Sequence, residues 1–311
     1  MRTLLLAVCL LFAFSLPAPA AVINVEFNFT PYFAPADPNA KQVDTIPGKA
    51  VVFLNNQILA EQELEKRDLP VLFEERQISP AVWVPASSMG PGLRKGMNSI
   101  RIEFTPANPT QPYLARFSWS EVTDKETRTD DGAGRSTATN YGGTGKEERP
   151  VKGKVVFERG FTADFAVDRA WHHYPPITAV SPADKASLIA LLKERATLFK
   201  PNFAAAYKLL EKQPNLTVPA MKKAKCLENA YKVGIRVKAP TLEQLEAVVS
   251  NSPELLLQGK GGSPLHPFNR AAFEKIKGDE NQMCAAMALF TLYPPRLTVV
   301  RNPAGKWEVV E

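Results

Sequence analysis

The chain has 311 residues, of which 45% are hydrophobic and 23% charged, and its formal net charge is +6. These proportions are ordinary for globular proteins with large cores, which excludes a disordered chain. The basic residues are dispersed among acidic ones without an arginine-rich run, so nucleic acid and a strongly anionic membrane are poor candidates for partners. The length predicts about two domains.

The first twenty residues have the organisation of a secretory signal peptide. Arg2 supplies a positive charge, residues 4–16 form an apolar run, and small residues precede the expected cleavage after Ala20. The mature protein is therefore predicted to be periplasmic or extracellular, without membrane insertion once the signal is removed. Two alternatives stay open: a membrane anchor, for which the run is shorter than the ~20 residues needed, and lipidation of Cys9.

Two cysteines follow the signal, Cys226 and Cys284. In an oxidising compartment such a pair predicts a structural disulfide, here one that ties a helix to the C-terminal sheet. Neither cysteine has a Cys or His neighbour at metal-ligand spacing, so we predict no metal site and no cofactor. Two free thiols remain the alternative.

Residues 21–170 carry the pattern of an antiparallel β-sandwich. Apolar residues alternate with polar ones, or form short runs bounded by Pro, Gly and Asn, as strands do. Asn55-Asn56 predicts a tight turn, because asparagine tolerates positive φ. The predicted strands cover residues 22–29, 50–54, 58 onward, 82–84, 99–104, 113–119 and 154–165.

One stretch of this region, residues 124–153, is rich in Thr, Gly, Asp, Lys and Glu and nearly free of apolar side chains. It buries too little surface to offset its ordering entropy, so we expect a long mobile loop. A functional lid is the alternative.

Helical patterns begin at Ser181, after a linker at residues 171–180. Ser181-Pro182-Ala183-Asp184 combines a capping residue, a proline at the first helical position and a capping-box acid. We expect an α+β domain over residues 181–311, in which helices precede a small antiparallel sheet. The predicted helices begin near residues 181, 203, 220, 241 and 269, and the predicted strands cover 255–258, 284–293, 297–299 and 307–309.

Two stretches of the predicted sandwich resemble galactose-binding-like jelly-roll modules, namely Phe53-Leu54-Asn55-Asn56 and the run LRKGMNSIRI at residues 93–102. In that family a strand ends in an Asn-Gly turn, and a later Gly-Lys-Asn turn feeds an Ile-rich strand. Asn56 stands where glycine is usual, and Met97 where lysine is common. The resemblance covers residues 50–104 and implies a sandwich that in relatives often binds sugars or mediates packing. It implies no catalysis.

Trp171-His172-His173-Tyr174 places two histidines between two aromatic residues. Trp171 and Tyr174 are candidates for an aromatic surface, because aromatic faces stack on sugar rings. Adjacent residues of an extended segment point to opposite sides, so the two imidazoles would not share a metal ion. A linker that packs the two domains together is the alternative interpretation.

A glycine-rich, basic stretch at residues 258–263 lacks the spacing of a phosphate loop. Exposed amides at a helix that Asn269 would cap, with basic side chains nearby, could still hold a carboxylate or phosphate. An ordinary connection between a strand and a helix is the alternative. The candidate ligand-binding residues are Lys260, Ser263, His266, Asn269 and Arg270.

No catalytic signature is present: the sequence has no Gly-x-Ser-x-Gly, His-Glu-x-x-His or Cys-x-x-Cys. We therefore predict a non-catalytic exported envelope protein that binds a glycan or a protein partner, and name no catalytic residue. One competing hypothesis is a secreted hydrolase acting on envelope polysaccharide, with carboxylates brought together by the fold. Another is a C-terminal α+β domain that holds a small ligand.

Overall fold

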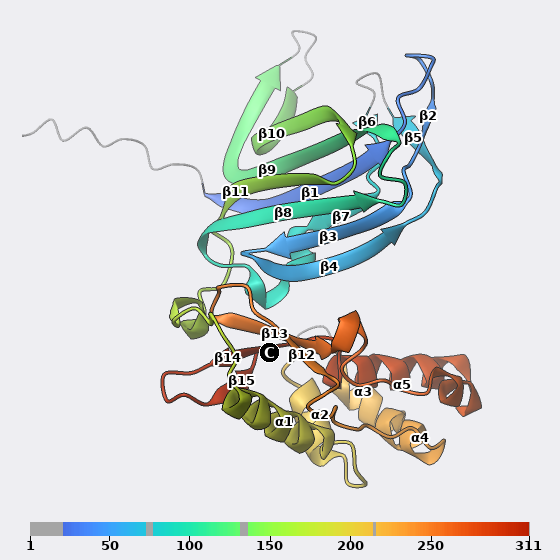
Figure 1. Ribbon diagram of the computed structural model, residues 1–311, viewed down its shortest axis with the longest axis vertical. Coiled ribbons are helices and arrows are strands. Elements are labelled where there is room, and N and C mark those ends of the chain that lie inside the picture. Colours follow the sequence, from blue (N-terminus) through green and yellow to red (C-terminus); the bar gives the residue numbers. More distant parts are fainter. Residues whose placement is uncertain (1–20, 73–76, 131–135, 214–215, 311) are drawn as a thin grey trace, which may run out of the picture.

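The computed structural model describes residues 21–72, 77–130, 136–213 and 216–310, without the side chains of residues 125–142 and 270. The signal peptide predicted for residues 1–20 lies outside the described residues. Most strands form antiparallel sheets in the N-terminal part, and the helices lie toward the C-terminus (Figure 1). No helix of the described chain is both long and apolar enough to cross a membrane.

Two four-stranded antiparallel sheets form the N-terminal part, with strand orders β10-β9-β1-β7 and β11-β8-β3-β4. A small third sheet, β2-β5-β6, lies beside them. The strands are β1 (Val22–Tyr32), β2 (Gln42–Asp44), β3 (Gly48–Leu54), β4 (Gln57–Leu64), β5 (Asp68–Leu72), β6 (Gln77–Ile78), β7 (Val82–Pro85), β8 (Gly96–Pro106), β9 (Pro112–Asp130), β10 (Ser136–Lys152) and β11 (Val155–Ala163). Two 3₁₀ turns, η1 (Ala86–Ser88) and η2 (Gly90–Gly92), follow β7.

Aromatic side chains from both large sheets fill the space between them, which makes this part a β-sandwich. The ring of Phe27 on β1 lies 4.9 Å from that of Phe161 on β11, and Phe29 lies 5.7 Å from Phe104 on β8. Because successive side chains of a strand point to opposite faces, Val25, Phe27 and Phe29 of β1 enter this core. Its even-numbered residues Glu26 and Asn28 are left on the outer face of the sheet.

The predicted tight turn at Asn55-Asn56 is confirmed. Both residues have positive φ, 49° and 68°, and they join β3 to β4. The turn also binds the start of β8, because Asn55 Nδ2 donates to Asn98 Oδ1 at 2.9 Å and the Ser99 amide donates to Asn55 Oδ1 at 2.9 Å.

The prediction of a mobile loop at residues 124–153 is wrong. Most of this stretch belongs to β9 and β10, which pair from Pro112 and Lys152 to Asp130 and Ser136 and rise out of the sandwich as an arm (Figure 1). The backbone ladder between β9 and β10 holds the arm together, and threonine favours extended structure. A strand can therefore be ordered by cross-strand hydrogen bonds as well as by the burial of apolar side chains.

The C-terminal part combines helices with a fourth antiparallel sheet, of order β12-β13-β14-β15. Ser181 caps the first helix as predicted, accepting a hydrogen bond from the Asp184 amide at 3.1 Å. The elements are η3 (Ala170–His173), α1 (Pro182–Ala196), α2 (Ala204–Leu210), α3 (Val218–Lys223), α4 (Cys226–Lys232), β12 (Leu245–Val248), β13 (Glu254–Gly259), η4 (Lys260–Gly262), η5 (Arg270–Lys275), α5 (Asp279–Leu292), β14 (Leu297–Arg301) and β15 (Trp307–Val309).

Three sequence predictions for this part are wrong. The helix expected at Thr241 is a turn leading into β12; the capping-box bond from the Thr241 amide to Gln244 Oε1 forms at 3.0 Å, but no helix follows. A strand was expected at residues 284–293, but residues 284–292 are helical and belong to α5. One side of this helix packs on α4. The helices do not all precede the sheet, since β12 and β13 come before α5.

The predicted disulfide between Cys226 and Cys284 is confirmed. Cys226 begins α4 and Cys284 lies within α5, so the bridge joins two helices rather than a helix and a sheet. The second core surrounds this bridge, and Cys226, Leu227 and Leu289 are fully buried in it.

Candidate functional site

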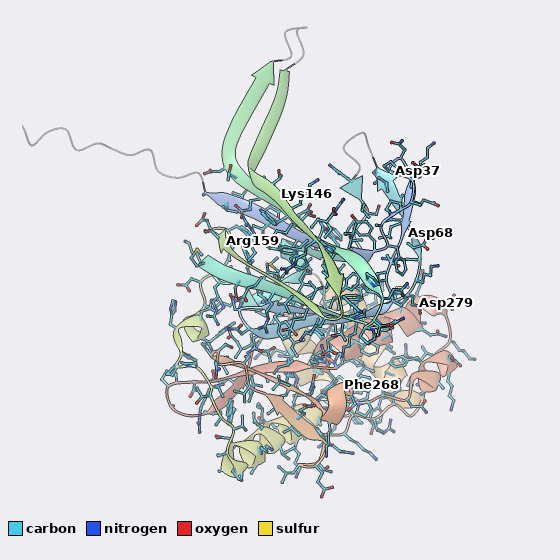
Figure 2. The ribbon with its side chains drawn as sticks, turned by 45° about the horizontal axis from the view of Figure 1, so that its top comes forward. Asp37, Asp68, Lys146, Arg159, Phe268 and Asp279 are labelled. Carbon is cyan, nitrogen blue, oxygen red and sulfur yellow. A yellow bond between two sulfur atoms is a disulfide. The ribbon has the colours of Figure 1, made fainter. Side chains whose placement is uncertain are left out.

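The outer face of the sheet β10-β9-β1-β7 carries a row of four residues across its strands. Lys146, Ser118, Asn28 and Trp83 are successive partners in the strand register. Neighbouring strands lie about 4.8 Å apart, so the row spans about 14 Å. Figure 2 marks Lys146 on β10, below the projecting arm.

Polar residues flank this row on both sides of the same face. In β1, β9 and β10, residues two positions away share the outer face, because the side-chain period of a strand is two. The flanking outward residues are Glu26, Ser120 and Thr144 on one side, and Thr30, Arg116 and Glu148 on the other.

A hollow of about 570 Å³ lies over this face. Its floor includes Glu26, Asn28 and Ser118, and its wall is formed by Leu72 and the segment 77–80 around β6. The chain between β5 and β7 thus turns a flat sheet face into a groove. We call it the outer-face groove.

Asn28 lies at the middle of the floor with an unused acceptor. Its Oδ1 atom is buried and accepts no hydrogen bond from any described residue. An unpaired buried acceptor costs about 1–3 kcal/mol, so a donor that enters the groove gains from this atom.

Trp83 gives the groove an exposed aromatic neighbour. Its side chain is 61% exposed, and its Nε1 donates to Glu26 Oε2 at 3.3 Å. Because Trp83 is the register partner of Asn28, an indole and an unpaired amide acceptor lie side by side on the same face.

Arg116, Glu148 and Tyr32 form a hydrogen-bonded cluster at one end of the groove. The Tyr32 hydroxyl donates to Glu148 Oε2 at 2.6 Å, and Arg116 Nε donates to the same oxygen at 2.5 Å. Burial alone would raise the pKa of Glu148, but the hydrogen bonds from Tyr32 and Arg116 hold it below its usual value. Burial and the bond to Glu148 raise the pKa of Tyr32 to about 12. The cluster therefore keeps a fixed ion pair at neutral pH.

Of the predicted ligand-binding residues at 260–270, those whose side chains the structure describes do not converge on one site. Lys260 and Ser263 share an exposed turn, in which Ser263 Oγ donates to the Lys260 carbonyl at 3.0 Å. The carboxylate of Glu246 already accepts a hydrogen bond from this turn, because the Gly261 amide donates to Glu246 Oε2 at 3.0 Å.

His266 faces the helical core instead. It is 3% exposed, its Nδ1 lies 2.9 Å from the Lys238 carbonyl, and its ring packs 5.3 Å from that of Tyr293. Burial lowers its pKa. Asn269 does not cap the following helix through its side chain, contrary to prediction, and that helix is the short 3₁₀ segment η5. The side chain of Arg270 lies outside the described residues.

The two predicted aromatic candidates lie at the linker. Trp171 is half-buried, with its ring 5.6 Å from that of His172 and beneath the Arg169 guanidinium. Tyr174 is also half-buried and lines a polar hollow of about 370 Å³ together with His172. The buried His172 contacts the Pro91 carbonyl at 3.0 Å, so this segment packs on the sandwich.

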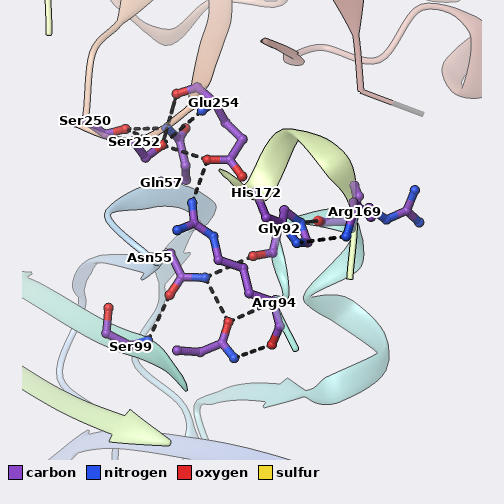
Figure 3. Close-up of polar contacts among 12 residues, drawn as sticks. Asn55, Gln57, Gly92, Arg94, Ser99, Arg169, His172, Ser250, Ser252 and Glu254 are labelled. Atoms are coloured by element: carbon purple, nitrogen blue, oxygen red, sulfur yellow. Dashed lines mark hydrogen bonds and ion pairs between the residues drawn. The ribbon is translucent and has the colours of Figure 1, made fainter. Parts of the chain in front are cut away.

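A polar network joins the turn after β3 and the loop after β7 to the start of β13 (Figure 3). Gln57 Nε2 donates to Ser252 Oγ at 2.7 Å and also contacts Ser250. Arg94 Nη2 forms an ion pair with Glu254 Oε2 at 2.9 Å. We call this set the junction network.

Asp44 and Asp68 are a pair of carboxyl groups that share a hydrogen bond and alter each other's pKa. They are partners on β2 and β5, and Figure 2 labels Asp68 at the edge of the molecule. Their mutual hydrogen bond lowers the pKa of Asp44, which Lys66 also lowers, and raises the pKa of Asp68. Carboxyls in direct contact are closer than the ~5–10 Å that glycosidases use.

No family model, curated protein or solved structure matches this chain. Among the described residues, no three His, Cys, Asp or Glu side chains gather as a metal site requires. The outer-face groove was missed at the sequence level. Its signals were the polar residues alternating with Val25, Phe27 and Phe29 and a tryptophan within a short strand.

Proposed function

We propose that the mature protein is a non-catalytic exported envelope protein that binds a glycan in the outer-face groove. The observation that carries the proposal is the buried, unpaired Asn28 Oδ1 acceptor beside the exposed Trp83. A sugar offers hydroxyl donors for the amide oxygen and an apolar ring face for the indole. Ser118, Ser120 and Thr144 add hydroxyl groups that both donate and accept.

The charges of the groove favour a neutral glycan. Arg116 forms an ion pair with Glu148, and the remaining charges of the groove, those of Glu26 and Lys146, are opposite in sign. Because Glu148 has a lowered pKa, it stays ionised at neutral pH and is a poor proton donor for glycoside hydrolysis. This supports binding over the competing hydrolase hypothesis.

We further propose that the chain consists of two domains, the sandwich at residues 21–170 and an α+β domain at residues 181–311. Separate apolar cores support this division, one in the sandwich and two in the C-terminal part. The bonds of Asn55 with Asn98 and Ser99 join the two stretches that resemble galactose-binding-like modules, in support of that resemblance.

Export of the protein is part of the proposal, and the surroundings of Ala21 support it. The Ala21 backbone nitrogen lies 2.9 Å from Asp124 Oδ1, and the Val22 amide donates to Asp164 Oδ2 at 2.8 Å. Cleavage after Ala20 would create an ammonium group beside these two carboxylates. The new terminus would thus gain charge partners where it forms.

We expect the secreted protein to begin at Ala21, as read by intact mass and N-terminal sequencing of protein from the periplasm and the medium. A tag fused directly to Ala21 should lower the yield of folded protein more than the same tag after Glu311, because β1 begins at Val22. A mature protein that retains residues 1–20 would contradict the export proposal.

Trp83→Ala and Asn28→Ala are each expected to weaken glycan binding at least about tenfold, because each removes a contact that the ligand alone completes. The measurement is an array of envelope polysaccharide fragments, followed by calorimetry on each hit. Met97→Ala, which changes an apolar residue 72% exposed on the opposite sheet, is the matched control and should bind normally.

Two outcomes of this experiment would count against the groove. Undiminished binding by both variants, with loss in Trp171→Ala, would move the site to the linker. Shortening of the bound glycan during incubation would favour the hydrolase.

A further inference from the structure

A second hollow, which we call the junction cavity, lies between the sandwich and the C-terminal sheet. Its volume is about 260 Å³. Leu54, Ile58 and Met89 line it from the sandwich, and Leu256 and Val310 line it from the C-terminal part. The walls are mainly apolar, as in small-molecule sites.

Glu254 is one of the polar residues that line this mainly apolar cavity, together with Gln57, Ser88, Arg296 and Thr298. Its side chain is 3% exposed, and its Oε2 accepts hydrogen bonds from Arg94 Nη2 and Ser252 Oγ, both at 2.9 Å. Its Oε1 is buried and has no hydrogen-bond partner among the described residues. Figure 3 shows this second oxygen pointing away from Arg94.

The charge balance around the cavity limits what Oε1 can accept. Arg94 already neutralises Glu254, and Arg296, which also lines the cavity, pairs with Glu61 at 2.9 Å. A cation would therefore bring an uncompensated charge into an apolar space, and an anion would be repelled by Glu254. A neutral hydroxyl or N–H donor supplies the missing hydrogen bond without adding charge.

We propose that the junction cavity binds a small neutral molecule with an apolar body and one hydrogen-bond donor, which donates to Glu254 Oε1. Phenols and small alcohols belong to this class. The site is separate from the outer-face groove and does not depend on it, because the two hollows share no lining residue.

The probe is phenol, tested by saturation-transfer NMR and calorimetry on the mature protein. Toluene has the same shape without the donor, and benzylamine adds a positive charge. We expect saturable millimolar binding of phenol, with toluene and benzylamine each at least about tenfold weaker. Toluene leaves Glu254 Oε1 without a donor, and benzylamine brings a positive charge into the apolar cavity. Absence of saturable phenol binding, or equal binding of phenol and toluene, would overturn the proposal.

Two variants locate the binding. Val310→Trp fills the cavity from the edge of the C-terminal sheet without replacing any residue of the junction network, and should abolish phenol binding. Lys306→Gln, an exposed change in the turn before β15, is its control and should bind as the unaltered protein does. Phenol binding that survives in Val310→Trp would place the probe elsewhere and contradict the assignment.

A double variant, Arg94→Met with Glu254→Leu, removes the acceptor and its countercharge together. In this variant phenol and toluene should bind with equal affinity. Retention of a tenfold preference would contradict the role of Glu254. Should the double variant fail to fold, the probe series on the unaltered protein and Val310→Trp still decide the proposal.

Discussion

Removing the Cys226–Cys284 bridge by changing both residues to alanine is expected to lower the free energy of unfolding by about 4 kcal/mol. The two cysteines are 58 residues apart, and the bridge restricts this length of chain in the unfolded state. In the folded state it links α4 to α5 across the second core. Urea unfolding, followed by the ellipticity of the helices, measures the loss.

Titration of thiols in the denatured, unreduced protein provides the companion test. The mature protein should show no reactive thiol, and reduction should reproduce the stability loss of the double variant. Two titratable thiols before reduction would contradict the bridge. An unchanged unfolding midpoint after reduction would contradict its structural role.

Replacing Arg94 with methionine is expected to lower the free energy of unfolding by about 3 kcal/mol. Glu254 is 3% exposed and Arg94 25% exposed, so the variant leaves a buried carboxylate with Ser252 as its remaining side-chain donor. Thermal and urea unfolding report the change. The matched control is Lys49→Met, which breaks an ion pair with Glu61 whose lysine is 46% exposed, and should cost under about 1 kcal/mol.

The double variant Arg94→Met, Glu254→Leu separates the cost of an unpaired charge from the value of the pair. It should regain most of the stability lost in Arg94→Met, because two apolar side chains can replace a buried ion pair with little loss. Equal stability of the single and double variants would show that the loss in Arg94→Met comes from packing.

Local patterns were sufficient to predict most strands of the sandwich. The alternation in β1 and the positive-φ pair Asn55-Asn56 each act within a few residues, so the sequence displays them directly. The disulfide was also predictable, because only two cysteines follow the predicted signal peptide. The Ser181 capping box predicted the start of α1 for the same local reason.

The errors come from interactions between distant residues. The β9–β10 arm depends on a ladder with its partner strand, which composition does not reveal. The aromatic and proline residues after position 289 suggested a strand, but packing on α4 makes α5 helical. Thr241 makes its predicted bond with Gln244, yet the chain turns into β12 to pair with β13.

The outer-face groove could not be predicted because its residues meet through register. Trp83, Asn28 and Ser118 are far apart in the sequence and become neighbours once β7, β1 and β9 pair. The candidate residues at 260–270 present the opposite case. Proximity in sequence suggested a common site, but the chain turns His266 into the core while Lys260 stays exposed.

The most direct test of glycan binding in the groove follows the side-chain amide of Asn28 by ¹⁵N NMR during titration with the tightest glycan found on the array. We predict that the Asn28 amide and the Trp83 indole shift more than any other side-chain N–H groups, with the same saturation curve. A glycan that binds while both signals stay fixed would contradict the account.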